Sequence, residues 1–578
     1  MRRACRNYLA MARQPLLAGD ADNAEAAILQ ALATLAREDV GARLWQKDAS
    51  LWSDDLQEQA AIRHRLGWLN VVADVRRSGL DEIFTSAETV RAAGYTDAVI
   101  LGMGGSSLCP DVCRATFGAA PGWLRLHVLD STHPRAVQAV HDAVDVRRTL
   151  FVVSSKSGTT GESNAFYQYF WDRVRQAGIT PPGANFIAIT DPGTPLDEEA
   201  TARGFRHVFR NPADIGGRYS ALSFFGLVPM ALLGIDVADF LGRAAAMARR
   251  CGPEVAAAEN PGVVLGAQLA THAQQGRDKL TLVCAPEIAT VGWWLEQLVA
   301  ESLGKQGYGV VPVEGEDVGQ PEDYGADRVF VHTSLPGTDG ENDVEGLQAL
   351  AAAGHPVIRL TMAETMDLGQ EFFRWEVATA VAGHLLGVNP FDEPNVQESK
   401  DNTAALLQTY QREGALPLET PDLVAGPLSL YGDCEGTSVA EALQGFFSHV
   451  APGDYVALMA YLPQAEVVQR RMDALRHTLR AVTPAATTMG YGPRFLHSTG
   501  QLHKGGPNAA VCLQLTADIA DDVPIPGAPY SFGTFIRAQA LGDMRSLRGH
   551  GRRVLRVHLG ADYEQGLAAL ESALNELH

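Results

Sequence analysis

The hydrophobic pattern divides the chain into a helical beginning and a long alternation of short strands with helices. Residues 23–38 carry apolar side chains at three- and four-residue spacing, which predicts an amphipathic helix. From residue 97 onwards, β-rich runs are separated by stretches long enough for a helix. The predicted strands are 97–104, 125–130, 149–155, 185–190, 279–285, 327–334, 356–362, 455–462, 509–517 and 553–559. This alternation predicts an α/β fold with parallel sheets.

The length of 578 residues exceeds what one hydrophobic core supports, so we expect several units. The pattern predicts a helical N-terminal segment, two tandem doubly wound parallel-sheet domains and an additional C-terminal α/β unit. A stretch rich in Pro, Gly and acidic residues near 412–424 favours a boundary there. The expected units are residues 1–85, 86–244, 245–411 and 412–578.

Charge and composition narrow the classes of partner. The net charge of −21 disfavours nucleic acid, because a duplex-binding protein usually presents a basic face. No apolar run approaches twenty residues, so the sequence predicts no membrane span. The first fifteen residues are read as a polar helix, since Arg13, Gln14 and Pro15 interrupt a short apolar run. Seven scattered cysteines are typical of reduced thiols in a cytoplasm.

The strongest local signal is a hydroxyl-rich turn between a buried strand and a helix. Ser154, Ser155, Ser157, Thr159 and Thr160 stand in this turn together with two glycines. Backbone N–H groups at a helix start favour an anion, and hydroxyl groups add hydrogen bonds to it. The alternative is an ordinary capped turn, for which one or two hydroxyls suffice. Five hydroxyls favour a phosphate site.

A glycine loop at 102–107 follows the strand that begins at residue 97. Its glycines permit a ligand to approach the backbone closely. The third glycine of a dinucleotide fingerprint and the Gly-Lys-Ser/Thr of a Walker loop are both missing. The loop therefore indicates a small anion or sugar site, and the sequence predicts no dinucleotide cofactor.

Two further segments carry acid–base and electrostatic candidates. Gln297 and Glu301 are four residues apart, so they share one face of a predicted helix, and a carboxylate there is a candidate general base. A solvated helix face is the alternative interpretation. Arg218 stands in a glycine-rich loop at 216–220, from which a guanidinium can stabilise developing oxygen charge.

Together these segments resemble the glucose-6-phosphate isomerase family. The family's phosphate loop reads Ser-Lys-Thr/Ser-x-Thr-Thr-x-Glu, which is matched at 155–162. Its Gly-Gly-Ser loop is matched at 104–106, its Gly-Gly-Arg-Tyr/Phe-Ser segment at 216–220, and its Gln-x-x-x-Glu-Ser-x-Gly-Lys helix at 297–305. The order and spacing agree over roughly 95–400. The resemblance implies two sugar-isomerase α/β domains, in agreement with the strand pattern.

The resemblance also implies roles for these residues. Glu301 would carry a proton between carbons 2 and 1 of a hexose 6-phosphate through a cis-enediol, and Arg218 would stabilise the enediolate. The implied substrate- and phosphate-binding residues are Gly105, Ser106, Ser155, Lys156, Ser157, Thr159, Thr160 and Gln297. This chemistry needs no metal and no redox cofactor.

Ring opening in the family uses a Lys and a His. Lys400 matches the Lys, since the Asn389–Asp392 segment and the following spacing fit the family's final helix. The family's His falls soon after the catalytic Glu, where this chain has none. His497 matches a Leu-His-Ser-x-Gly-Gln segment of bacterial members, although it lies beyond Lys400, and His355 is the alternative. Glu393 and Gln397 also depart from the family, which has Gln and Glu there.

The part of the chain after residue 400 extends past the usual end of the family. It resembles the tail of isomerases that are fused to transaldolase. Because the family's ring-opening His comes from a neighbouring subunit, the resemblance implies a homodimer or other homo-oligomer. It also implies a cytoplasmic enzyme of glycolysis and gluconeogenesis. Two alternatives stay open: a non-catalytic sugar-phosphate sensor, and an isomerase that also accepts mannose or amino-sugar 6-phosphates.

Overall fold

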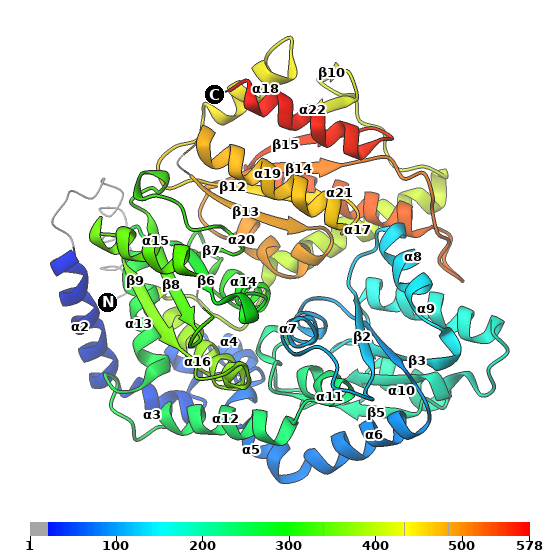
Figure 1. Cartoon of the computed structure of the whole chain (residues 1–578), viewed down its shortest axis with the longest axis horizontal. Helices are drawn as coiled ribbons and strands as arrows, with labels where there is room; N and C mark the ends of the chain where they lie inside the picture. Colours follow the sequence, from blue (N-terminus) through cyan, green and yellow to red (C-terminus); the bar gives the residue numbers. More distant parts are fainter. Residues whose placement is uncertain (1–20, 339, 433, 484, 578) are drawn as a thin grey trace.

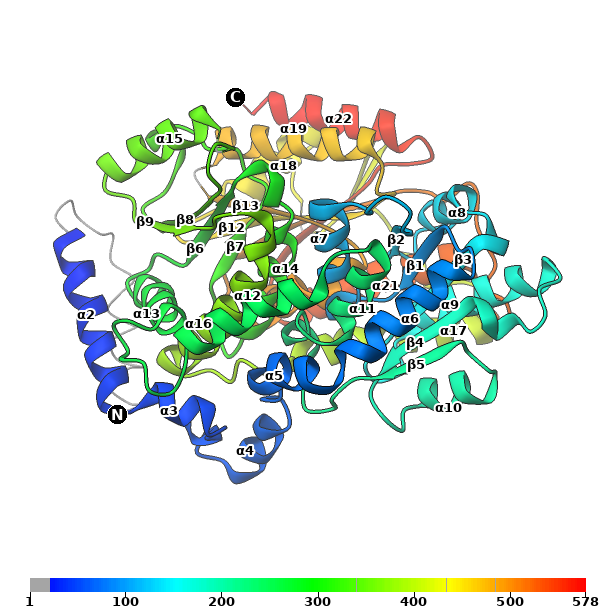
Figure 2. The same cartoon turned by 60° about the horizontal axis from the view of Figure 1, so that its bottom comes forward.

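The computed structural model describes residues 21–338, 340–432, 434–483 and 485–577. The chain begins with helices, as predicted, while the polar helix expected at the first fifteen residues lies outside the described residues. The helices of this segment are α2 (Ala21–Arg37), α3 (Val40–Trp45), α4 (Leu56–Arg63), α5 (Trp68–Ser78) and α6 (Leu80–Ala92). Asp55 caps α4 by accepting hydrogen bonds from the N–H groups of Gln57 and Glu58. Figure 2 shows these helices along the outside of the molecule.

The first sheet is entirely parallel, with the order β2-β1-β3-β4-β5. Its strands are β1 (Asp97–Leu101), β2 (Arg125–Leu129), β3 (Thr149–Ser154), β4 (Phe186–Thr190) and β5 (His207–Arg210). The helices of this unit are α7 (Leu108–Phe117), α8 (Pro134–Ala143), α9 (Gly161–Gln176), α10 (Pro195–Ala202) and α11 (Phe224–Leu233). The four strands predicted here are confirmed.

The second sheet is also parallel and has the order β7-β6-β8-β9. Its strands are β6 (Lys279–Cys284), β7 (Val311–Val313), β8 (Arg328–Ser334) and β9 (Val357–Thr361). The helices are α12 (Val237–Arg250), α13 (Pro261–Gln274), α14 (Val291–Leu303), α15 (Glu341–Ala352) and α16 (Leu368–Leu386). The three strands predicted in this stretch are confirmed as well.

The C-terminal sheet has the order β10-β11-β15-β14-β12-β13 and is mixed, because β10 and β11 form an antiparallel edge. Its strands are β10 (Leu423–Ala425), β11 (Leu428–Tyr431), β12 (Tyr455–Tyr461), β13 (Ala486–Tyr491), β14 (Ala510–Thr516) and β15 (Arg553–His558). The helices are α17 (Pro394–Glu413), α18 (Val439–Phe447), α19 (Glu466–Val482), α20 (Thr499–Gly505), α21 (Phe532–Gly549) and α22 (Tyr563–Asn575). Helix α17 packs against α21.

The parallel part of all three sheets shares one strand order. The first strand of each unit lies between the second and the third, so the chain reverses its direction of winding there. Ligands of doubly wound sheets bind outside the carboxyl ends of the strands at such a reversal. In Figure 1 the sheets form three lobes, and α7, α14 and α20 lie between them. Helix α14 contacts both α7 and α20, so the three units meet at one place.

A continuous apolar core fixes the N-terminal helices to the first two sheets. Trp68 of α5 is fully buried and packs against Tyr219 and Phe373, with ring centroids 5.4 and 5.9 Å apart. Aromatic side chains of this size contribute much of the apolar burial in a core. The loop that carries Arg218 is therefore held by a rigid support. Within the described ranges, no helix is both long and apolar enough to cross a membrane.

Candidate active site

The hydroxyl-rich turn lies between the end of β3 and the start of α9. Thr160 occupies the N-cap position of α9 and its side chain makes no capping hydrogen bond. Ser155 Oγ donates to Thr160 Oγ1 over 3.2 Å, and the hydroxyls of Ser157 and Thr159 are 2.8 Å apart. Ser157 and Thr159 are exposed. A helix start with uncapped N–H groups and exposed hydroxyls is suited to a phosphate.

Lys156 faces away from the ligand side of this turn. Its ammonium group forms an ion pair with the Asp191 carboxylate and donates to the carbonyl of Ala213 over 3.0 Å. These partners follow β4 and β5, so Lys156 ties the turn to the neighbouring strands. Of the residues predicted to bind phosphate here, Lys156 has its ammonium group engaged by two partners and Ser155 donates its hydroxyl to Thr160, whereas Ser157 and Thr159 are exposed.

The glycine loop at 102–107 packs closely against the loop that carries Arg218 and the loop that carries His497. A Cβ atom on Gly105 would lie only 2.0 Å from the carbonyl oxygen of Gly217. Gly104 has φ +54°, and a Cβ there would come within 3.0 Å of both Gln297 Nε2 and His497 Cβ. The buried Ser106 accepts at its carbonyl a 3.0 Å hydrogen bond from Ser154 Oγ, which joins this loop to the hydroxyl turn. Only glycine permits this close approach.

Glu301 and Gln297 lie on the buried face of α14, which excludes the solvated-face interpretation. Their exposed fractions are 6% and 3%, and Gln297 Nε2 donates to Glu301 Oε2 over 3.1 Å. Burial raises the pKa of Glu301 to about 7, against the opposing effect of the Arg218 charge. A carboxyl group with a pKa near the operating pH is matched to general acid–base work.

Arg218 is buried and every nitrogen of its guanidinium is engaged. It donates to Ser302 Oγ over 2.7 Å, to the carbonyls of Pro390 and Asp392 over 2.7 and 2.8 Å, and to Glu393 over 2.9 Å. Its Nη1 lies 3.6 Å from Glu301 Oε1. Burial works to lower the pKa of Arg218, but the carboxylates of Glu301 and Glu393 raise it above its usual value. A fixed positive charge therefore stands beside Glu301.

His497 belongs to the C-terminal unit and lies at the same site as Gln297 and Glu301. It lies in the short helix Arg494–His497 after β13, and its Nε2 is 3.1 Å from Glu162 Oε1. Its carbonyl accepts a 2.8 Å hydrogen bond from Gln297 Nε2. His355 lies instead in the second unit, where its ring contacts Tyr324 and Phe330. The structure thus brings His497, and not His355, to the site.

The loop that carries His497 is fastened to the first unit by Arg494. Its Nη2 donates to Asp111 of α7 over 3.0 Å, and its Nε lies 3.3 Å from Asp130, which follows β2. In addition, Gln501 donates to the carbonyl of Gly304 at the end of α14 over 3.1 Å. The loop therefore reaches both the first and the second unit of the same chain.

Glu162 is a site residue to which the sequence motifs assigned no role. It stands in the first turn of α9 and is buried. Burial works to raise the pKa of Glu162, yet the electrostatic interaction and hydrogen bond with His497, together with Lys400, hold it below its usual value. Lys400 is exposed on α17, within electrostatic reach of this carboxylate. The match of 155–162 to the family motif contained Glu162, but only a partner 335 residues away reveals its contact.

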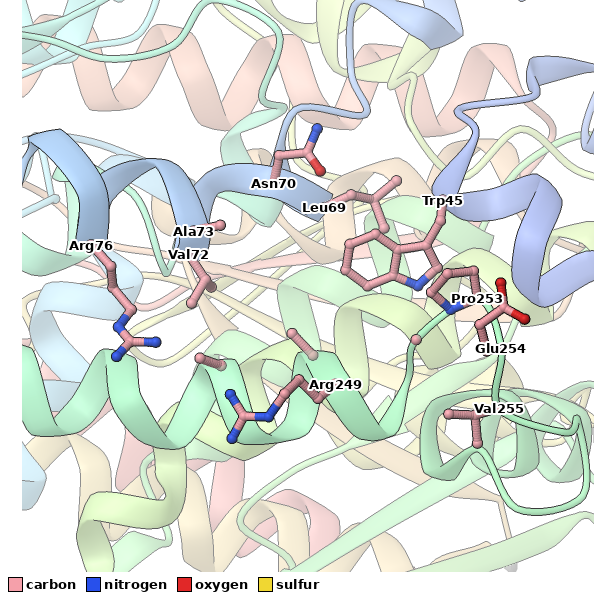
Figure 3. Close-up of a pocket in the computed structure, with 13 residues that line it drawn as sticks. Trp45, Leu69, Asn70, Val72, Ala73, Arg76, Arg249, Pro253, Glu254 and Val255 are labelled. Carbon is pink, nitrogen blue, oxygen red and sulfur yellow. The ribbon is translucent and has the colours of Figure 1, made fainter.

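A separate groove lies on the surface between α5 and α12 (Figure 3). Its volume is about 490 Å³, and Trp45, Leu69, Val72, Pro253 and Val255 contribute to its mainly apolar lining. Arg76 and Arg249 stand along it. These residues are distinct from those predicted for the site, so the groove is separate from it.

The fold is α/β, and the site brings a hydroxyl-rich helix start together with a buried carboxyl group and a buried guanidinium. Residues 69–311 match the family model of phosphoglucose isomerase. A glucose-6-phosphate isomerase of Rubrobacter xylanophilus is 32% identical over 381 residues, which are 57% of this chain and 87% of that protein. One of Symbiobacterium thermophilum is 31% identical over 392 residues, or 59% and 86% of the two chains.

A solved structure agrees with these sequence matches. The crystal structure of a hypothetical protein from Thermus thermophilus superimposes with a TM-score of 0.57 at 25% identity, covering 66% of this chain and 98% of that one. The chain belongs to the phosphoglucose isomerase family. The resemblance predicted from the motifs is thereby confirmed, and so is the predicted α/β fold class.

Proposed function

We propose that this enzyme interconverts glucose 6-phosphate and fructose 6-phosphate. The observation that carries the proposal is the Glu301 carboxyl group, whose pKa is raised to about 7 and which stands 3.6 Å from the Arg218 guanidinium. The hydroxyl turn at 155–160 binds the phosphate, while Ser106 and Gly105 of the adjacent loop complete this end of the site. Gln297 lines the space between the phosphate and the reacting carbons.

The isomerisation needs one group that reaches two carbons. Glu301 removes the proton from carbon 2 of the open-chain aldose and returns it to carbon 1 of the resulting cis-enediol. Negative charge develops on the enediolate oxygens during this transfer, and the buried guanidinium of Arg218 stabilises it. The four other contacts of Arg218 hold it in place before the charge forms, so little reorganisation accompanies the reaction.

Ring opening precedes the transfer and is assigned to His497 and Lys400. His497 contacts both Glu162 and Gln297, and Lys400 acts electrostatically on the same Glu162 carboxylate. Since His497 reaches the site from its own chain, the proposed chemistry needs no histidine from a neighbouring subunit. Homo-oligomerisation remains a prediction from the family resemblance alone.

The reaction assigns the enzyme a place in carbohydrate metabolism. Its substrates are charged sugar phosphates, which are made and consumed inside the cell, so we place it in the cytoplasm, in glycolysis and gluconeogenesis. A coupled assay with glucose, mannose and glucosamine 6-phosphates tests the proposal directly. Turnover of glucose 6-phosphate supports the proposal. If the protein binds these compounds tightly but turns over none of the three, it is a sugar-phosphate sensor instead.

The hydroxyl turn gives the first prediction. Ser157→Ala and Thr160→Ala each remove a donor to the phosphate, so KM for fructose 6-phosphate should rise by roughly tenfold or more while kcat changes less. Initial rates over a range of substrate concentrations measure both constants. Thr409→Ala is a matched control, because this residue is half-buried on α17 and its hydroxyl donates to the carbonyl of Ala405 in its own helix. Unchanged KM in both site variants would disprove the phosphate assignment.

The raised pKa of Glu301 gives a pH prediction. The base must be ionised, so kcat/KM should fall as the pH decreases through about 7. The charge of Glu393 is one cause of that raised pKa. Replacing it by Gln, the residue that the family has there, lowers the pKa of Glu301 and should move the acid limb to lower pH.

The substrate's phosphate also titrates, with a pKa near 6, but the protein variant leaves that step in place. pH profiles of kcat/KM for the wild type and for Glu393→Gln separate the titration of Glu301 from the titration of the substrate's phosphate. Glu364→Gln is the control, since Glu364 pairs with Arg243 at the surface. An acid limb that stays in place when Glu393 is changed would contradict the assignment of that limb to Glu301.

A further inference from the structure

Gln539 connects the C-terminal unit to Glu162, whose carboxylate contacts His497. It lies on α21 with 2% of its surface exposed. Its Nε2 donates to Glu162 Oε1 over 2.7 Å, and its Oε1 accepts a 2.6 Å hydrogen bond from Thr132 Oγ1. Thr132 and Glu162 belong to the first sugar-isomerase unit, so this one amide spans the interface between the two units.

The chemistry of an amide makes this arrangement directional. The amide oxygen only accepts hydrogen bonds and the amide nitrogen only donates them. Because an ionised carboxylate only accepts hydrogen bonds, Gln539 turns its N–H group to Glu162, and its oxygen then accepts from the Thr132 hydroxyl. A hydrogen bond to a charged group is stronger than one between neutral groups. Thr132, itself fully buried, donates to the amide oxygen and so supports this orientation of Gln539.

Glu162 Oε1 receives two donors, Gln539 Nε2 at 2.7 Å and His497 Nε2 at 3.1 Å. A neutral imidazole carries one N–H, and a carboxylate engages that N–H and thereby selects the tautomer. Nε2 of His497 therefore holds its proton toward Glu162, and Nδ1 is left for the sugar. Both the ring orientation and the tautomer of His497 depend on where the Glu162 carboxylate stands.

We propose that Gln539 is a positioning residue for ring opening, which holds Glu162 so that His497 presents Nδ1 to the cyclic sugar. The C-terminal unit then supplies both the ring-opening histidine and the support that orients it. This inference rests on the proposed isomerase function. It predicts a defect that is confined to the cyclic substrate, whereas an amide that only joins the two units would affect every step alike.

The test compares a substrate that must be opened with one that is already open. 5-Deoxyfructose 6-phosphate lacks the hydroxyl that closes the ring, so exchange of its C1 hydrogen with D₂O, followed by proton NMR, reports the Glu301 step alone. Gln539→Met keeps the side-chain volume and removes both hydrogen bonds. We expect kcat/KM on glucose 6-phosphate to fall by about 10- to 100-fold, with the exchange rate of the open-chain analogue unchanged within error.

Two further variants and one control make the outcome specific. Thr132→Val releases the amide oxygen and should give a smaller defect of the same selectivity. Gln539→Glu, which sets a second carboxylate against Glu162, should give a larger one. Gln514→Met is the matched control, because Gln514 is a fully buried amide of the same unit that donates to the carbonyl of Ala540, next to Gln539. It should leave both rates at the wild-type values.

The outcomes separate the two claims. If the wild-type enzyme neither isomerises glucose 6-phosphate nor exchanges the analogue, the proposed function fails and this inference fails with it. If the wild type is active and Gln539→Met loses both activities equally, or neither, the positioning role alone is overturned. Should Gln539→Met not fold, as judged by thermal unfolding, the selectivity of Thr132→Val decides in the same way.

Discussion

Replacing Glu301 by Gln should lower kcat by about 10²–10⁴-fold and leave KM close to the wild-type value. An amide at this position cannot accept the proton from carbon 2, but its oxygen can still accept the hydrogen bond that Gln297 Nε2 donates over 3.1 Å. The geometry around the phosphate turn and Arg218 is therefore retained. Steady-state kinetics in the direction of glucose 6-phosphate measure both constants.

The same substitution at a neighbouring acid of α14 serves as the control. Burial raises the pKa of Glu296 to about 8, so this acid is largely protonated at neutral pH and Gln is close to it in shape and charge. Glu296→Gln should turn over at nearly the wild-type rate. If Glu301→Gln also keeps that rate, Glu301 is not the base and the proposed mechanism is wrong.

Replacing His497 by Ala should slow turnover of glucose 6-phosphate by about 10²–10⁴-fold, the usual contribution of a positioned proton-transfer group. The effect is expected only where a ring must be opened, because the imidazole of His497 contacts Glu162, whereas the proposed mechanism assigns the proton transfer between the two carbons to Glu301. Exchange at C1 of 5-deoxyfructose 6-phosphate should therefore persist in the variant.

His477→Ala provides the comparison for this experiment, since His477 is exposed on α19 of the same unit. It should have no effect on either substrate. Equal losses of His497→Ala on the cyclic and the open-chain compound would remove His497 from ring opening and assign it a structural role.

The sequence predicted the strands well where they are long and apolar. β3 and β12 are entirely buried runs rich in β-branched, aromatic and aliphatic residues, so their short length and composition locate them. β7 spans only Val311–Val313, which is too short for a pattern, and β13 contains a glycine and no continuous apolar run. The antiparallel β10 and β11 lie beyond the βα alternation on which the prediction relied.

The site divides in a similar way. The phosphate turn, Arg218 and Glu301 are local motifs, so their identity could be inferred before the units were placed in space. The burial of Glu301 could not be predicted in this way, because it depends on α20 and on the loop around Phe391, which pack near α14. Gln539 lies within an ordinary amphipathic helix, and only its contacts with Thr132 and Glu162 distinguish it from other amides.

The two departures from the family motif have different consequences. Glu393 places a carboxylate 2.9 Å from Arg218, where the family has a neutral amide, and it thereby contributes to the raised pKa of Glu301. Gln397 donates to Asp401 on the exposed side of α17. The first substitution thus changes the electrostatics of the site, and the second lies outside it.

The arrangement of three units around one ligand can be tested by a crystal structure with a five-carbon aldonic acid 5-phosphate. The planar carboxylate of this compound stands in for the enediolate, and its phosphate corresponds to that of the substrate. We expect the phosphate at the turn of residues 155–160, the carboxylate between Glu301 and Arg218, and the imidazole of His497 from the same chain against the sugar. A ligand bound elsewhere, or a histidine contributed by a second chain, would contradict the account.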